Sequence, residues 1–87
     1  MPNKADQAQL YRTSDIYFSA YLMSLDVPLE ATETGQNSQG ERKVTFVFKV
    51  QQSMIGRAKA QYFGGTGTVK ARRFVDNLRN LKSMCFA

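Results

Sequence analysis

The stretch KVTFVFKV, residues 43–50, decides the fold that the sequence predicts. Its residues alternate in polarity, and alternation of period two is typical of a β-strand with one buried face. The face predicted to be buried consists of Val44, Phe46, Phe48 and Val50, and the opposite face consists of Lys43, Thr45, Val47 and Lys49. Two interpretations of Lys43 and Lys49 stay open: they bind a partner, or they only keep an apolar strand from aggregating.

A helix and a weaker strand are predicted before this stretch. Thr13-Ser14-Asp15 favours a helix start, because a hydroxyl group can cap free amides and the carboxylate complements the helix dipole. The helix continues over residues 16–25 with apolar side chains at helical spacing, and it ends before Pro28. Residues 29–34 form a modest edge strand, and the loop GQNSQG at 35–40 joins the two strands as a hairpin.

Two helices are predicted after the stretch. Residues 54–63 have an apolar stripe, and Gly64-Gly65 ends this helix because glycine accepts the left-handed cap conformation. The last helix runs from about Val69 to Cys85 with Thr68 as its N-cap, and its apolar spacing is the cleanest in the chain. The GGTGT segment between these helices is predicted to be a turn, because it lacks the spacing of a phosphate-binding loop and follows no strand.

These elements predict one small α+β domain over residues 13–87, in the order α-β-β-α-α, with an antiparallel hairpin packed against helices. Residues 1–12 are polar and without periodicity, so we expect a flexible N-terminal tail there. A chain of 87 residues buries only about 60% of the surface that its unfolded form exposes, so pairing with a second copy is one way to gain core.

The charge of the chain is distributed unevenly. Residues 1–41 contain two basic and six acidic side chains, a net charge of −4, whereas residues 42–87 contain ten basic and one acidic, a net charge of +9. Such asymmetry suggests a polyanionic partner for the basic half. The alternative is that the acidic half neutralises the basic half once the chain folds, and the sequence leaves both interpretations open.

Residue types needed for most catalytic chemistry are missing. The chain has no histidine, which removes the commonest general base and metal ligand, and Cys85 is its only cysteine. We therefore expect no enzyme, no metal site, no cofactor and no small-molecule substrate. No apolar run of about 18 residues and no apolar leader is present, so we expect no membrane span and a cytoplasmic location.

The basic half is predicted to bind DNA or RNA weakly and without strong sequence preference. The residues expected to contact phosphates are Arg42, Lys43, Lys49, Lys70, Arg72, Arg73 and Arg79. The order strand, helix, glycine turn, helix over residues 42–87 is similar to a ribbon-helix-helix module, in which strands of two chains pair and enter the major groove. An RNA-binding sheet is a weaker interpretation, because the glycines of its aromatic motif are missing.

A protein-interaction module is the alternative function. Many aromatic residues for so small a domain could form an exposed docking patch for a protein partner or a second copy: Tyr11, Tyr17, Phe18, Tyr21, Tyr62, Phe63, Phe74 and Phe86. Salt response separates the two functions, because nucleic-acid binding weakens steeply with salt and apolar docking does not.

Three segments in fixed order resemble one family: YRTSDIYFSAYLMSLDVPL, then VTFVFK, then QYFGGTGTVKARRFVDNLRNLKSM. The chain is similar to the DUF5659 family of small bacterial and phage proteins. The matching positions are Thr13, Ser14, Asp15, Tyr17, Ala20, Leu22, Phe46, Val47, Phe48, Tyr62, Gly65, Val69, Ala71, Phe74, Leu81 and Lys82. The resemblance implies that most of residues 11–86 form one unit, and it implies no activity.

Overall fold

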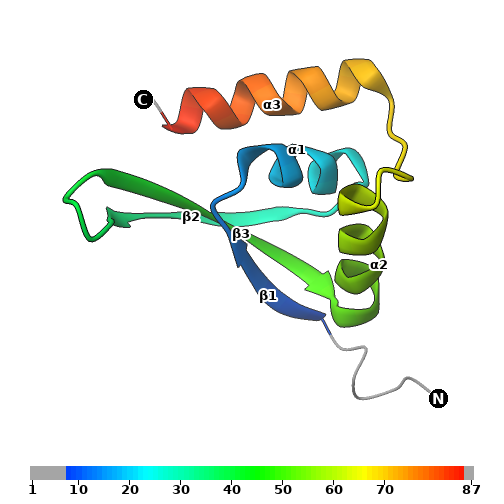
Figure 1. The fold of residues 1–87 in the computed structure, drawn as a ribbon, viewed down its shortest axis with the longest axis horizontal. Helices are drawn as coiled ribbons and strands as arrows, with labels where there is room; N and C mark the ends of the chain where they lie inside the picture. The colour runs from blue at the N-terminus through cyan, green and yellow to red at the C-terminus, as the bar shows by residue number, and fades with distance from the viewer. Residues whose placement is uncertain (1–7, 86–87) are drawn as a thin grey trace.

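The structure, a computed structural model, describes residues 8–85 of the 87-residue chain. The elements in chain order are β1 (Ala8–Thr13), α1 (Ile16–Ser24), β2 (Leu29–Gln36), β3 (Arg42–Gln51), α2 (Gln52–Phe63) and α3 (Ala71–Cys85). The predicted α+β class is confirmed, with a three-stranded antiparallel sheet and three helices (Figure 1). Within residues 8–85, no helix is long and apolar enough to cross a membrane.

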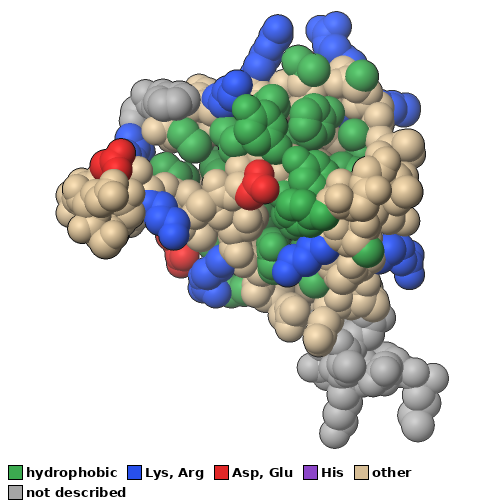
Figure 2. All heavy atoms as spheres, viewed as in Figure 1, with side chains coloured by type: hydrophobic (Ala, Val, Ile, Leu, Met, Phe, Trp, Pro, Cys, Tyr) green, Lys and Arg blue, Asp and Glu red, His purple; other side chains and the backbone are tan. Residues whose placement is uncertain are grey.

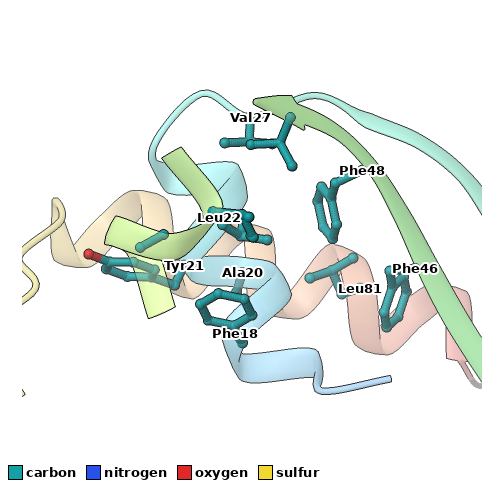
Figure 3. Close-up of a cluster of buried hydrophobic side chains, with 11 residues drawn as sticks. Phe18, Ala20, Tyr21, Leu22, Val27, Phe46, Phe48 and Leu81 are labelled. Carbon is teal, nitrogen blue, oxygen red and sulfur yellow. The ribbon is translucent and has the colours of Figure 1, made fainter. Parts of the chain in front are cut away.

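Residues 43–50 belong to β3, the central strand of the sheet. The strand order is β1-β3-β2, and β3 pairs antiparallel with both neighbours. Helix α1 lies on one face of this sheet, and α3 lies along α1 (Figure 1). Phe46 and Phe48 face these helices, and Leu81 of α3 points toward both rings in the core (Figure 3). The buried face of β3 therefore packs with α1 and α3 in one cluster of apolar side chains.

Part of the predicted N-terminal tail is a strand, β1. Residues 8–12 were expected to be flexible, but they belong to β1, which pairs with β3 from Ala8 opposite Gln51 to Thr13 opposite Phe46. Residues 1–7 lie outside the described part of the chain. The order is therefore β-α-β-β-α-α. A six-residue strand with mostly polar side chains gives little local signal, because its stability comes from pairing with a strand distant in sequence.

The ends of the helices differ from the predicted caps. Asp15 is the N-cap of α1, and its Oδ1 accepts hydrogen bonds from the backbone amides of Tyr17 and Phe18, both at 3.0 Å. The Thr13 hydroxyl, predicted to be a possible cap, instead accepts from the amide of Asp15. Thr68 is not the N-cap of α3, because that helix begins three residues later, at Ala71.

Candidate functional site

The seven basic residues predicted to contact nucleic acid do not form one surface. Lys43 and Lys49 alternate with the buried phenylalanines of β3, so they point to the sheet face that α1 and α3 leave uncovered. Arg42 is at the start of the same strand. The remaining four residues lie on α3 or immediately before it: Lys70, Arg72, Arg73 and Arg79. The predicted contact residues thus come from two elements of the fold, β3 and α3, and from the turn before α3.

Two of the α3 arginines are paired with carboxylates. Arg73 forms an ion pair with Asp26 beyond the end of α1, which lowers the pKa of the Asp26 carboxyl through a hydrogen bond and through charge. The same contact raises the pKa of Arg73. Arg72 pairs with Asp76 one turn later, at 3.3 Å, the spacing at which opposite charges interact on a helix surface. These contacts reduce the positive charge that α3 can offer to a phosphate backbone.

The ribbon-helix-helix interpretation is wrong. It requires β3 to pair with the same strand of a second chain, but residues 46–48 of β3 already have neighbours on both sides. Phe46 and Phe48 face the helices of their own chain, so they are not available to stack on RNA bases either. The sheet therefore offers neither of the nucleic-acid readouts considered from the sequence.

A different surface brings aromatic side chains together. Tyr17 and Tyr21 of α1, Tyr62 and Phe63 of α2, and Phe74 of α3 make up what we call the aromatic patch. The rings of Tyr21 and Tyr62 lie 5.2 Å apart between centroids, and those of Tyr62 and Phe63 lie 4.9 Å apart. Figure 2 shows apolar side chains gathered over the region where the three helices meet.

Phe63 is both exposed and held in place. Its side chain is 67% exposed, and that of Tyr17 is 49% exposed. The Phe63 ring nevertheless lies 5.5 Å from the ring of Phe18, which is fully buried in the core. Gly64 and Gly65 follow directly, and Gly65 has a φ of 76°, so the chain turns away immediately after the ring. The patch thus presents to solvent an aromatic ring that also contacts the core.

The Asp15 carboxylate lies near the rings of the patch and affects the pKa of Tyr62. Burial raises the pKa of the Tyr62 phenol, and the nearby Asp15 carboxylate and Tyr17 raise it further. The phenol of Tyr62 is therefore a neutral hydrogen-bonding group at physiological pH. Asp15 is exposed and caps α1 beside these rings. Within residues 8–85, no three His, Cys, Asp or Glu side chains gather closely enough to hold a metal ion.

Basic side chains surround this patch. Lys59 lies one helical turn before Phe63, and its ammonium group is 4.7 Å above the ring of Tyr11. Lys70 and Arg72 flank Ala71, which lines the groove described next. Figure 2 shows Lys and Arg side chains around the apolar region on several sides. Lys59 was not among the predicted contacts, although its position four residues before an aromatic residue on a predicted helix was a usable signal.

A groove of about 530 Å³ opens at the α3 side of the patch. Its walls are Tyr21, Tyr62, Phe74 and Val75, and its rim is the turn from Gly65 to Val69. That turn is the GGTGT segment, and it connects two helices as predicted. Gly67 lies directly against the phenol end of Tyr21, so a Cβ atom at this position would collide with the ring. The close contact positions the turn against α1.

Gly67→Ala is expected to destabilise the protein by about 1–3 kcal/mol, because the added methyl group must displace a ring that is almost fully buried. Chemical denaturation would measure this loss. Gly35→Ala is the matched control, since a Cβ atom there meets nothing within 4 Å and the change should stay within about 0.5 kcal/mol. Equal stability of the two variants would contradict the contact between Gly67 and Tyr21.

The chain matches a known protein family. A family model described as a domain of unknown function, DUF5659, matches residues 8–87, which is nearly the whole chain. No curated protein and no solved structure matches the chain.

Proposed function

Because the chain belongs to the DUF5659 family, whose function is unknown, we propose a function from its own surface. The protein binds single-stranded nucleic acid, weakly and largely without sequence preference, through the aromatic patch. The basic side chains around the patch contact the phosphates. This proposal keeps the partner class that the charge of the chain suggested, and it centres the contact surface on the aromatic patch.

The exposed ring of Phe63 is the observation that supports this proposal most. Leaving such a ring in water costs free energy that burial would recover. With the partly exposed ring of Tyr17, it offers planar faces on which bases can stack, and each base–aromatic stack contributes about 1–3 kcal/mol. Lys59 and Lys70 add positive charge at the rim, in a chain whose net charge is +5.

The same geometry favours single strands over duplexes. The bases of a duplex are stacked on one another, so aromatic side chains reach their faces only after strand separation. A duplex would be held mainly through its phosphates, and two of the arginines expected to contact them, Arg72 and Arg73, are paired with carboxylates. Single-stranded nucleic acid can bend over the patch and use the rings and the rim together.

Asp15 should weaken binding, because its carboxylate lies beside the rings on which the bases would stack. Asp15→Asn is expected to raise the affinity for single-stranded DNA about two- to fivefold, the effect of removing one screened like charge. Asparagine caps helices as well as aspartate does, so stability should change little. A titration of both proteins with the same oligonucleotide would measure the change.

Glu41→Gln is the control for net charge, because Glu41 lies in the hairpin and is distant in sequence from every residue of the patch. It should raise the affinity less than Asp15→Asn does. An equal gain in both variants would show that net charge, and not the position of Asp15, controls binding.

Fluorescence polarisation with labelled oligothymidine and with a duplex of equal length tests the function, at about 50 and 200 mM salt. We expect the single strand to bind more tightly than the duplex. With about three phosphate contacts, its affinity should fall about 20-fold between the two salt concentrations. Equal binding of the duplex, or no binding of either at the lower salt concentration, would refute the proposal.

Docking of a protein partner is the second candidate function for the same surface. The groove beside Tyr21 and Phe74 favours it, because its lining is mainly apolar and suits an apolar side chain of a protein. An amphipathic peptide whose binding is insensitive to salt, and which displaces no oligonucleotide, would support this candidate.

A further inference from the structure

The groove at the α3 side of the aromatic patch contains a polar group without a partner. Tyr21, which lines this groove, is only 4% exposed, and its hydroxyl forms no hydrogen bond with any residue from 8 to 85. Figure 3 shows the phenol oxygen pointing away from the other labelled side chains of the core. Every fully buried side-chain oxygen or nitrogen in the described part of the chain has a partner, so this hydroxyl must reach the groove. It can donate to a ligand there and accept from it.

The same groove lies at the start of α3. Its rim includes Thr68, Val69 and Ala71, the first residue of that helix. The amide of Phe74 makes the first helical hydrogen bond of α3, to the carbonyl of Lys70 at 3.0 Å. The amides before it have no partner inside the helix, and no side chain of the described residues caps them. Free amides at a helix N-terminus can bind a phosphate group.

The charge at this end of α3 also favours an anion. The first turn contains no acidic residue, and Lys70, Arg72 and Arg73 lie together at the positive end of the helix dipole. Basic side chains at this end destabilise a helix, and a bound anion would relieve the repulsion. Arg72 and Arg73 are paired with carboxylates. Lys70 is exposed and forms no ion pair with any residue from 8 to 85, so it is the cation that a ligand at the start of α3 would contact.

We propose that this groove binds the 5′-terminal nucleotide of the single strand, an inference that rests on the proposed function. The base packs on the apolar lining, which includes Tyr62, Phe74 and Val75, and it forms a hydrogen bond with the hydroxyl of Tyr21. The 5′-phosphate lies at the start of α3, where Lys70 and the free amides bind it. The groove volume of about 530 Å³ is within the usual range of ligand sites, about 300–1,000 Å³. An apolar side chain of a protein would leave the hydroxyl and the amides without a partner.

Three oligothymidines of equal length, labelled at an internal base, test this inference by fluorescence polarisation with the full-length protein. One carries a 5′-phosphate, one a 3′-phosphate and one neither. We expect the first to bind about tenfold more tightly than the other two, because charge-assisted hydrogen bonds hold its phosphate. The 3′-phosphate is the control for net charge. Equal binding of all three would overturn the inference, keep the proposed function and leave the groove to a protein partner. No binding of any strand would overturn both.

Thymidine 5′-monophosphate distinguishes the end of a strand from a free nucleotide. It should displace the 5′-phosphorylated strand, but with an affinity at least about tenfold lower, because it cannot also stack on the exposed rings of Tyr17 and Phe63. An affinity equal to that of the strand would overturn the end of a strand as the ligand.

Two variants with matched controls complete the test. Lys70→Gln should remove most of the preference for the 5′-phosphate, whereas Lys49→Gln, the same change on β3, should keep it. Tyr21→Phe should weaken binding of the 5′-phosphorylated strand about three- to tenfold by the loss of one hydrogen bond, whereas Tyr11→Phe, on β1, should not. Stability should not fall in Tyr21→Phe, since its hydroxyl bonds no residue from 8 to 85. Unchanged binding by Tyr21→Phe, or an unchanged preference in Lys70→Gln, would show that the inference is wrong.

Discussion

Phe48→Ala is expected to lower the free energy of unfolding by about 3–5 kcal/mol. The Phe48 side chain is completely buried at the centre of β3, and Leu81 of α3 points toward it (Figure 3). Its removal leaves a cavity between the sheet and two helices that the surrounding side chains cannot fill. In a domain of this size, such a loss is a large part of the total stability, which is about 5–15 kcal/mol for most proteins.

Denaturant titration of the parent and the variant would measure this effect. Leu10→Ala is the control, because Leu10 lies in the same sheet but is 50% exposed, so its loss should be within about 1 kcal/mol. If both substitutions cost the same, the contact that joins the central strand to α3 does not stabilise the fold as described.

The double variant Tyr17→Ala and Phe63→Ala should lose most of the affinity for single-stranded DNA. Each ring is expected to contribute about 1–3 kcal/mol by stacking, so the combined loss is at least about 30-fold. Both side chains are largely exposed, so the variant should remain folded. Polarisation titrations with oligothymidine measure the loss, and circular dichroism checks the fold.

Leu10→Ala is also the control for this second prediction. It removes an exposed apolar side chain from β1, on the sheet face that the helices do not cover, and it should leave DNA binding unchanged. A double variant that binds as well as the parent would show that the aromatic patch does not bind DNA. Binding would then depend on charge alone.

The central strand could be predicted from the sequence because alternation of polarity is a local property. The burial of Val47 could not be predicted in this way. Val47 was assigned to the exposed face, yet it is only 3% exposed. Arg12 of β1 lies opposite Val47, and Glu33 of β2 lies opposite Thr45. These two side chains form an ion pair at 3.1 Å, which crosses β3 above Val47. A residue of the exposed face is thus covered by partners that are far away in the sequence.

The candidate site was predicted only in part, for a similar reason. The aromatic residues of the patch were recognised as a possible docking surface, because their number is visible in the sequence. Which of them stay exposed depends on how α1, α2 and α3 meet, and local spacing does not determine this. The basic residues were predicted as one group, but β3 and α3 place them apart. Asp26, which neutralises Arg73, is 47 residues away from it.

An NMR titration of the isotope-labelled protein with unlabelled oligothymidine tests the central claim most directly. It reports, residue by residue, which surface contacts the nucleic acid. The largest saturable shifts should occur at the aromatic patch, above all at Tyr17, Tyr62 and Phe63, and they should weaken as salt is added. Largest shifts at Lys43 and Lys49 on the uncovered sheet face, or no saturable shifts at low salt, would contradict the account.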